Sequence, residues 1–402
     1  MSKTLNDPIY GFISIADELI LKIIDQPVMQ RLRRIRQMGL AHLVYPGANH
    51  TRLSHAIGAM HLAMRGLQIL KEKGVSFSNE ERLALLSAIL LHDIGHGPYS
   101  HALEGALTGR IPHEQLSIEI IEEFIDLPPE IKSMVIQILK GIYEKPWINQ
   151  MVASQLDMDR LDYLGRDSFF TGVSEGVIGS DRIISLLTVA DNNLAIEEKG
   201  IYSVEKFLIA RHLMYWQVYL HKTVLSAEYH LLLILKRLIY LKMKEQEPWM
   251  PPNLKKLMEA TSKLEKLYSF VKLDDTDIGY AIKTWTTHDD IILKELCMNL
   301  INRKLLKVKF FQEPISQDII RYLSQRINEI WNSDETSEFF LMHGQVTNIF
   351  YHPEKNPIYI LSKKGTINKA DKASKTISSL SQHVEIQKFY LLMPDFLVDE
   401  VN

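Results

Sequence analysis

Apolar residues recur at helical spacing through roughly the first 300 residues of the chain. Leu53, Ile57, Met60, Met64 and Leu67, for example, follow one another at intervals of three or four positions, which places them on one face of a helix. The same spacing predicts helices over roughly residues 17–24, 28–38, 51–73, 79–94, 113–125, 128–143, 149–167, 204–244, 253–267 and 289–304. The chain is therefore predicted to be mainly α-helical.

Two regions depart from this helical pattern. Residues 186–189 and 194–197 flank Asp191-Asn192-Asn193, and this pattern predicts a short β-hairpin because Asn and Asp tolerate the left-handed turn conformation. From about Lys307, strand-like runs alternate with predicted helices. The strands are expected near residues 308–310, 358–360 and 384–392, and the helices near 315–331 and 372–382. We expect two parts, residues 1–305 and a small α+β region over residues 306–402.

Composition narrows the class of protein. The chain has 402 residues, of which 46% are hydrophobic and 24% charged, as is typical of globular proteins. A net charge of −3 excludes a function based on a global positive field. The apolar runs are shorter than the ~20 residues of a membrane span, and no apolar signal segment opens the chain. Cys297, alone of its type, forms no internal disulfide. We predict a cytoplasmic protein with no membrane partner.

The histidines are unevenly distributed. Eight of the 15 lie between residues 42 and 113, which indicates chemistry rather than chance. The densest segment, His92-Asp93-Ile94-Gly95-His96-Gly97, follows an apolar helix. An aspartate at the end of a buried helix is costly unless it is paired or bound to a cation. Imidazole and carboxylate groups together suit a divalent metal ion.

A histidine and aspartate pair needs more distant partners to form a metal site. His55 lies upstream on a predicted amphipathic helix, and Asp159 lies downstream in a segment with four carboxylates between residues 157 and 167. A solvated charged face is the alternative for that segment. The ordered set His55, His92, Asp93 and Asp159 resembles the ligand pattern of the HD-domain metal-dependent phosphohydrolases.

Further motifs are similar to one branch of that family, the deoxynucleoside triphosphate triphosphohydrolases, which include bacterial dGTPase-like enzymes and the eukaryotic SAM- and HD-domain dNTPase. These motifs span residues 3 to about 310, and the last 90 residues match less clearly. They are Asn6–Ile9, Gln30–Arg33, Gln37–Gly39, Tyr45–Ala48, Arg52–His55, His92–His101, Asp159–Tyr163 and Tyr219–Lys222.

The resemblance implies an HD-domain helical bundle that hydrolyses a deoxynucleoside triphosphate to deoxynucleoside and inorganic triphosphate. It implies that His55, His92, Asp93 and Asp159 bind a divalent metal ion, with Mg, Mn, Fe, Co and Zn all open. The resemblance implies a catalytic set that carries protons to the leaving 5′-oxygen. This set is His96, Glu104 and His113, with Glu104 at a position where the family often has Asp.

The resemblance also implies a substrate-binding set. Arg52, His101, Arg160 and Arg211 would contact phosphate groups, with Arg160 in place of the family's usual Lys. The sugar would lie among Gln37, Tyr163 and Asp167, with Tyr219 beside them, and Tyr163 would crowd a 2′-hydroxyl. Leu220 replaces a polar residue found near the base in some members, so no base preference is implied.

A third implied site binds an activator nucleotide between subunits, and it implies a homo-oligomer, a dimer or a tetramer. Its residues would be Lys3, Asn6, Asp25, Arg33, Arg303 and Lys307. Ordinary surface charges are the alternative interpretation. Two other functions stay open: an HD phosphohydrolase acting on guanosine tetraphosphate or a monophosphate, and a nucleotide-regulated protein that binds single-stranded nucleic acid through Arg31, Arg33, Arg34 and Arg36.

Overall fold

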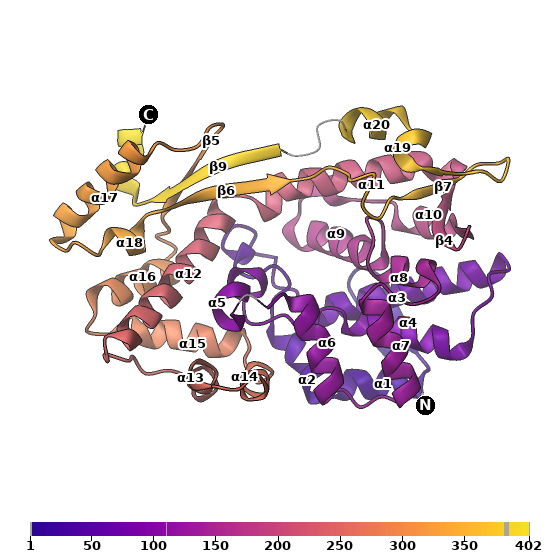
Figure 1. The fold of residues 1–402 in the computed structure, drawn as a ribbon, viewed down its shortest axis with the longest axis horizontal. Coiled ribbons are helices and arrows are strands. Elements are labelled where there is room, and N and C mark those ends of the chain that lie inside the picture. Colours follow the sequence, from indigo (N-terminus) through magenta and orange to yellow (C-terminus); the bar gives the residue numbers. More distant parts are fainter. Residues whose placement is uncertain (1, 110, 382–385, 402) are drawn as a thin grey trace.

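The structure is a computed structural model that describes residues 2–109, 111–381 and 386–401, apart from the side chains of residues 101 and 108. Helices dominate its first 300 residues (Figure 1). Helix α3 (Arg52–Glu72) packs against α4 (Asn79–Leu91) and α9 (Met158–Thr171) in the centre of the core. The close approach of α3 to α9 depends on Gly58, because a Cβ there would lie 2.0 Å from Asp162 Oδ1. The mainly α-helical prediction is confirmed.

The beginnings of these helices have clear local causes. The Thr51 and Ser78 side chains accept hydrogen bonds from the backbone three residues on, and so form capping boxes for α3 and α4. The Asp157 side chain caps α9 by accepting a hydrogen bond from the Arg160 backbone N–H. The other helices of this body are α1 (Glu18–Asp25), α2 (Pro27–Arg31), α5 (Glu104–Thr108), α6 (His113–Phe124), α7 (Pro129–Leu139), α8 (Pro146–Val152), α10 (Ser180–Ser185), α11 (Ile201–Met214), α12 (Lys222–Met243), α13 (Pro252–Glu259), α14 (Lys263–Phe270), α15 (Asp275–Trp285) and α16 (Ile291–Ile301).

Some predicted helices are divided. The predicted helix 204–244 is broken between α11 and α12 by a π-helical turn, Tyr215–Tyr219, after which the His221 side chain caps α12. The predicted helix 149–167 is two helices, α8 and α9. Pattern analysis missed α15 and an N-terminal hairpin of β1 (Lys3–Asp7) and β2 (Gly11–Ile15).

The predicted hairpin is confirmed as β3 (Leu187–Ala190) and β4 (Asn193–Glu197). Strand β4 also pairs in parallel with β7 (Tyr359–Leu361), which pairs with β8 (Ile367–Lys369). A separate sheet places β9 (Ile386–Met393) between β5 (Lys307–Phe311) and β6 (Met342–Asn348). The remaining helices are α17 (Gln317–Trp331), α18 (Ser337–Phe340), α19 (Ala370–Ala373) and α20 (Lys375–Ser381).

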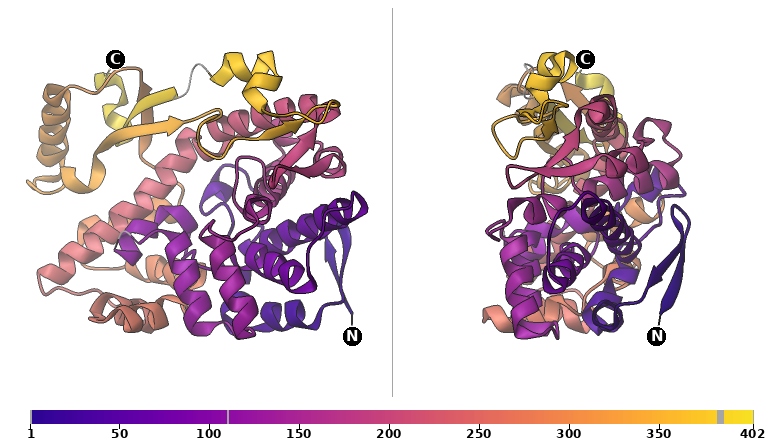
Figure 2. Two further views of the ribbon diagram at one scale, coloured as in Figure 1. Left: turned by 45° about the vertical axis from the view of Figure 1, so that its right-hand side comes forward. Right: turned by 90° about the vertical axis from the view of Figure 1, so that its right-hand side faces the viewer.

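The C-terminal strands lie along α11 and α12 (Figures 1 and 2). The segment after β6 also contacts the loop before α9, because Gln155 Nε2 donates to the carbonyl oxygens of His352 and Lys355 at 2.7 and 2.8 Å. The boundary at residues 305 and 306 stays a prediction. The pairing of β4 with β7 joins the two predicted parts in one sheet.

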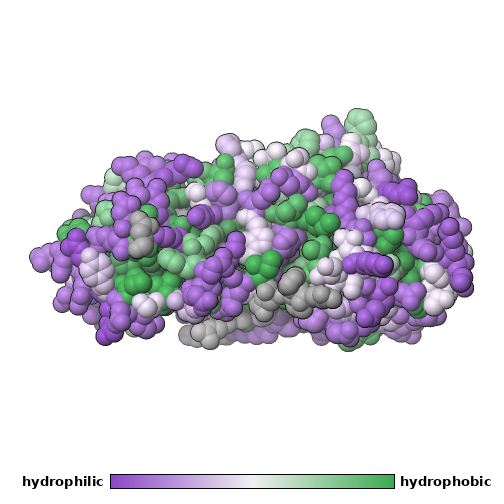
Figure 3. Space-filling model, turned by 90° about the horizontal axis from the view of Figure 1, so that it is seen from above, coloured by the Kyte–Doolittle hydropathy of each residue, from purple (hydrophilic) through white to green (hydrophobic). Residues whose placement is uncertain are grey.

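Among the helices of the described residues, none is both long and apolar enough to cross a membrane. Over the face seen in Figure 3, hydrophobic residues form patches among hydrophilic ones.

Cys297 is buried in α16, and this burial raises the pKa of its thiol to about 12, which suits an unreactive core residue.

Candidate metal centre and active site

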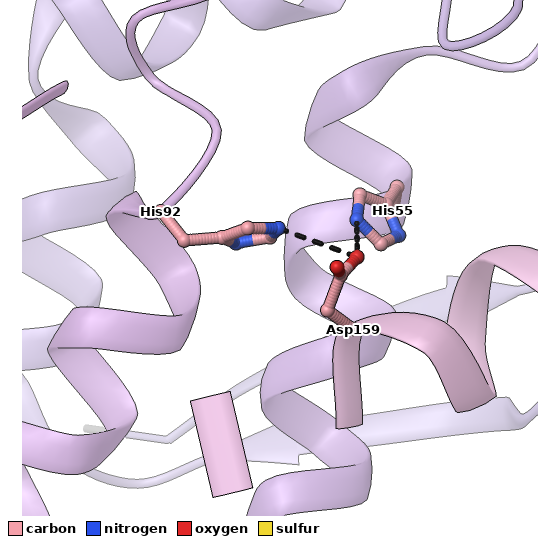
Figure 4. A group of neighbouring side chains, drawn as sticks. All are labelled: His55, His92 and Asp159. Carbon is pink, nitrogen blue, oxygen red and sulfur yellow. Dashed lines mark ion pairs between the residues drawn. The ribbon is translucent and has the colours of Figure 1, made fainter. Parts of the chain in front are cut away.

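Three helices bring the predicted metal ligands together. His55 comes from α3, His92 follows the last residue of α4, and Asp159 lies in the first turn of α9 (Figure 4). Asp159 Oδ1 lies 3.0 Å from His55 Nε2 and 3.4 Å from His92 Nε2. Asp93 Oδ1 lies 3.3 Å from His92 Nε2, and Asp93 Oδ2 lies 3.8 Å from His55 Nε2. Two imidazoles and one carboxylate, from His55, His92 and Asp159, therefore offer ligand atoms within 4.8 Å of one another, and Asp93 adjoins this group.

Hydrogen bonds on the far side of each imidazole determine which nitrogen is available. His55 Nδ1 donates to Asp162 Oδ2 at 2.8 Å, and His92 Nδ1 donates to the Ile89 carbonyl oxygen at 2.7 Å. The lone pairs on both Nε2 atoms then face the carboxylates. Neither Nε2 has a hydrogen-bond partner among the described residues, although both are buried. Such buried, unpartnered nitrogens fit the role of metal ligands.

The charge balance also favours a cation. Burial lowers the pKa of His55, but the neighbouring carboxylates of Asp159 and Asp162 outweigh burial and raise that pKa to about 10. The group of carboxylates thus attracts positive charge. The chemistry of this donor set suits a divalent ion that prefers nitrogen and oxygen ligands.

A buried network supports the His55 ligand from behind. Arg166 donates to both oxygens of Asp162, at 2.9 and 3.0 Å, and to Asp7 Oδ2 at 2.9 Å. These three side chains are almost completely buried. The sequence interpretation assigned no role to Asp162 or Arg166. Their spacing of four residues on one helix, which brings an acid and an arginine together, is the signal that could have identified the pair.

Arg52 holds the other carboxylate of the site. Its Nη1 donates to Asp93 Oδ2, and its Nε donates to Ser100 Oγ at 2.8 Å. Burial raises the pKa of Asp93, but the neighbouring His92, Arg52 and His96 outweigh it and hold the pKa well below its ordinary value. Arg52 was predicted to contact phosphate, and it also lines the cavity described below.

The predicted catalytic residues lie beside this cluster. The rings of His96 and His113 stack with centroids 3.9 Å apart. His113 Nδ1 lies 2.9 Å from Glu104 Oε1, and His96 Nε2 lies 3.4 Å from Asp93 Oδ1. Burial lowers the pKa of His113, but Glu104 outweighs burial and raises it above the ordinary value. The longer Glu104 side chain therefore reaches the histidine that the prediction assigned to it.

A cavity of about 380 Å³ opens onto both groups. Its walls include predicted substrate residues from three parts of the chain, namely Gln37, Arg52, Tyr163, Asp167 and Tyr219. Asp167 is held from two sides, because the Tyr219 hydroxyl donates to Oδ2 and His50 Nε2 approaches Oδ1, each at 2.7 Å. His50, taken from the sequence as structural, thus orients a residue of the cavity wall.

Comparisons with known proteins agree with this geometry. Residues 52–167 match the HD domain, and residues 178–247 match the HD associated region. The uncharacterized protein YwfO of Bacillus subtilis is 30% identical over 397 residues, covering 94% of this chain and 89% of YwfO. The chain belongs to the HD-domain family. A crystal structure of a phosphohydrolase from Bacteroides thetaiotaomicron resembles this HD protein with a TM-score of 0.92 and 42% identity, covering 98% of this chain and all of the other.

Another relative carries a specific activity in its name. The Dictyostelium discoideum deoxynucleoside triphosphate triphosphohydrolase SAMHD1 homolog is 28% identical over 381 residues, which cover 89% of this chain and 70% of the relative. The predicted HD-type family is therefore confirmed, and the chain is a hydrolase of the HD phosphohydrolase superfamily. HD domains bind divalent metal ions, and the cluster of His55, His92 and Asp159 is a candidate site for one.

Some predicted phosphate contacts of the HD protein lie apart from the cavity wall. Arg160 Nη1 donates to Asp157 Oδ2 at 2.8 Å. Arg211 donates to the carbonyl oxygens of Gln155 at 3.2 Å and Phe350 at 2.5 Å. The side chain of His101 lies outside the described residues. Their phosphate-binding roles stay predictions.

The predicted activator residues do not all come together within one chain. Lys3 and Asp25 form an ion pair of 2.8 Å in which both side chains are more than half exposed. Arg303 Nε donates to the Leu43 carbonyl oxygen at 2.7 Å, and Lys307 lies 3.5 Å from Asp395. The N-terminus and β5 lie at opposite corners of the HD protein in Figure 1. A site between subunits, which would also include Asn6 and Arg33, stays a prediction.

Most of the arginines between residues 31 and 36 bind partners within the same chain. Arg31 is 1% exposed and donates to three backbone carbonyl oxygens, including that of Leu273 at 2.8 Å. Arg34 pairs with Asp274 at 2.5 Å, and the Arg36 guanidinium lies 3.9 Å from Asp275. Arginines held by internal partners are poor phosphate contacts, so this arrangement weakens the nucleic-acid interpretation.

Proposed function

We propose that this protein hydrolyses deoxynucleoside triphosphates to a deoxynucleoside and inorganic triphosphate. The observation that carries the proposal is that one cavity adjoins the metal-type cluster, the paired histidines and a sugar-sized group of polar and aromatic side chains. The names of the SAMHD1 relatives support the same substrate class.

The phosphate end of the substrate would lie at the cluster. His55, His92 and Asp159, together with the adjoining Asp93, would hold a divalent ion, which would polarise a phosphate oxygen and lower the pKa of a water molecule. Asp162 would keep the His55 ring in the orientation that presents Nε2. Arg52 lies at the same wall and would offset negative charge as the phosphorus–oxygen bond breaks.

The leaving 5′-oxygen requires a proton. His113 lines the cavity, and its bond to Glu104 favours the protonated imidazole that can supply one. His96 stacks on His113 and would keep its ring in place. In this scheme Glu104 orients the acid and does not touch the substrate.

The sugar would lie between the cluster and Tyr219. The Tyr163 ring lies 6.4 Å from the His55 ring and 6.3 Å from the Tyr219 ring, so it stands at that intermediate position. Asp167 retains lone pairs for a 3′-hydroxyl, and the buried Gln37 Oε1 has no hydrogen-bond partner among the described residues. A 2′-hydroxyl against Tyr163 would lack a partner, so ribonucleotides should react more slowly by about tenfold or more.

The test is chromatography of the products from each of the four dNTPs, with Mg²⁺, Mn²⁺ and Co²⁺ compared. Release of deoxynucleoside and triphosphate in a 1:1 ratio supports the proposal. Release of monophosphate or pyrophosphate, or activity only on guanosine tetraphosphate, would replace it with another phosphohydrolase. Equal kcat/KM for GTP and dGTP would retain the reaction but contradict the sugar assignment.

A further inference from the structure

The residues that line the cavity include two chemically different groups. One group is charged and includes Arg52, Asp93, His113 and Asp159. The other group is apolar and forms the apolar side, where the segment around Ala41 contacts α12; it includes Met38, Ala41, Val218, Leu220, Val224 and Leu225. A nucleotide is divided in the same way, because its phosphates are charged and the faces of its base are apolar. A bound nucleotide that places its phosphates at the cluster therefore places its base on the apolar side.

One acid interrupts this apolar side. Glu228 lies on α12, one turn after Val224 and Leu225, and it lines the cavity with them. Its Oε1 lies 4.0 Å from the position that a Cβ of Gly39 would occupy. Gly39 has a φ of +50°, and a side chain there would press on the Tyr99 carbonyl oxygen at 3.1 Å. Gly39 lines the same cavity, so the absence of a side chain there leaves space beside the Glu228 carboxyl group.

The carboxyl group of Glu228 has no partner among the described residues. It accepts no hydrogen bond and takes part in no ion pair there. Burial alone raises its pKa to about 7, since no cation or donor offsets the burial. An unpaired acid on an apolar wall costs folding stability, and its position in a cavity suggests that the missing partner is a ligand.

We infer that Glu228 selects the base of the nucleotide and favours guanine. This inference rests on the proposed function. A carboxylate offers two acceptor oxygens, and guanine presents two adjacent donors, N1–H and the N2 amino group, along one edge. The pair forms two parallel, charge-assisted hydrogen bonds of the kind that carboxylates form with guanidinium groups.

The other bases match a carboxylate less well. Adenine and cytosine each place one amino donor beside a ring nitrogen that is an acceptor, and thymine places its single N–H between two carbonyl acceptors. In each case an acceptor lone pair would face the carboxylate oxygens, with no donor between them. Leu220 and Val224, which line the cavity with Glu228, have no polar side-chain group that would correct the mismatch.

The substitution Glu228→Gln reverses the match with almost no change of shape. The amide has one donor and one acceptor, and this is the pattern that glutamine uses to bind adenine. The variant should therefore lose preference for dGTP and gain relative preference for dATP. Glu313→Gln is the matched control, because Glu313 is exposed and lies in a loop outside the cavity.

The experiment is internal competition at pH 8 with all four dNTPs in one reaction. Relative rates of consumption give ratios of kcat/KM, and any activating nucleotide is the same for every substrate. We expect wild type to favour dGTP over dATP by about tenfold or more, and Glu228→Gln to reduce that ratio by about tenfold or more. Glu313→Gln should keep the wild-type ratio, and Glu228→Asp, which keeps the two acceptors, should still favour dGTP.

The outcomes separate this inference from the proposed function. Hydrolysis of all four dNTPs with a dGTP to dATP ratio that Glu228→Gln leaves unchanged would overturn the role of Glu228 and leave the activity in place. If no dNTP is hydrolysed, the proposed function fails. Calorimetry of deoxyguanosine and deoxyadenosine binding to the cavity then tests the preference for guanine. Equal affinity of wild type for the two nucleosides would overturn the inference as well.

Discussion

Two acids in the interior of this protein, the buried Asp162 and the half-buried Glu228, are held in opposite ways. Asp162, beneath the metal-type cluster, accepts hydrogen bonds from Arg166 and His55 on both of its oxygens. Glu228, across the cavity, accepts none from the described residues. Burial raises the pKa of both, but the partners of Asp162 outweigh burial and lower its pKa, whereas that of Glu228 rises to about 7. The paired acid, Asp162, supports the cluster, and we infer that the unpaired acid, Glu228, binds a ligand.

The largest expected effect is at the cluster itself. Asp93→Asn and His55→Ala should each reduce turnover by at least about 10³-fold, because each removes one of the four proposed metal ligands. Metal content by mass spectrometry should fall in parallel, while circular dichroism stays helical. His61→Ala, on the same helix but outside the cluster, is the control. Turnover at the wild-type level in either ligand variant would rule out the metal assignment.

The next effect tests the paired acid. Asp162→Asn should weaken metal binding by about 10–100-fold, because it changes the partner that orients His55. It should also reduce the free energy of unfolding by about 3 kcal/mol, because Arg166 stays buried with less compensation. The control is Asp181→Asn, which breaks the pair of Asp181 with Arg65 at an exposed position and should cost less than about 1 kcal/mol. Equal losses of unfolding free energy in Asp162→Asn and Asp181→Asn would show that the Asp162 network stabilises the fold no more than an exposed ion pair does.

The unpaired acid, Glu228, should make the folded protein less stable as the pH rises. The pKa of Glu228 rises from 4.5 to about 7 on folding, so the folded chain keeps a proton that the unfolded chain releases. Its contribution to stability is present below pH 4.5 and is lost as the pH rises to about 7. Glu228→Gln should therefore be more stable than wild type by roughly 1–3 kcal/mol at pH 8 and about equal at pH 4.5. Urea unfolding at both pH values measures this, and a pH-independent difference would contradict it.

The smallest effect on the isolated chain is expected at an exposed charge. Asp25→Ala removes the exposed pair with Lys3 and should change the stability of the monomer by less than about 1 kcal/mol. If the activator site between subunits is correct, the same change should abolish the stimulation of dATP turnover by dGTP and the associated assembly. Kinetics and light scattering check both. Rate and mass that do not respond to dGTP in wild type would remove the activator site.

The metal-type cluster, the Asp162 network and Glu228 differ in how well they can be predicted from the sequence. The cluster of His55, His92, Asp93 and Asp159 could be predicted because its members belong to ordered motifs in which residue type limits the chemistry. The Asp162 network could be anticipated only in part, since its third member, Asp7, is distant in the sequence. Glu228 could not be identified, because a single acid on an apolar helix has the pattern of an exposed position until the fold places it in a cavity.

The helix break before α12 was missed for a related reason. Residues 204–244 contain no proline or glycine, so the periodicity predicts one helix. The structure instead has a π-helical turn at Tyr215–Tyr219, and His221, which is not among the usual capping residues, caps the next helix. This break brings Tyr219 and Leu220 to the cavity wall. We attribute the helix break to packing against the rest of the fold, which the local sequence pattern does not contain.

The bonds between Gln155 and the segment after β6 have a consequence for the order of events during synthesis. Gln155 lies in the loop that leads into α9, the helix of Asp159, and its partners His352 and Lys355 are made much later by the ribosome. The parallel pairing of β4 with β7 likewise waits for residues near 360. A nascent chain that has already produced every proposed metal ligand therefore still lacks the contacts that hold the loop in front of α9. A prematurely terminated product would carry those ligands without the contacts that hold this loop.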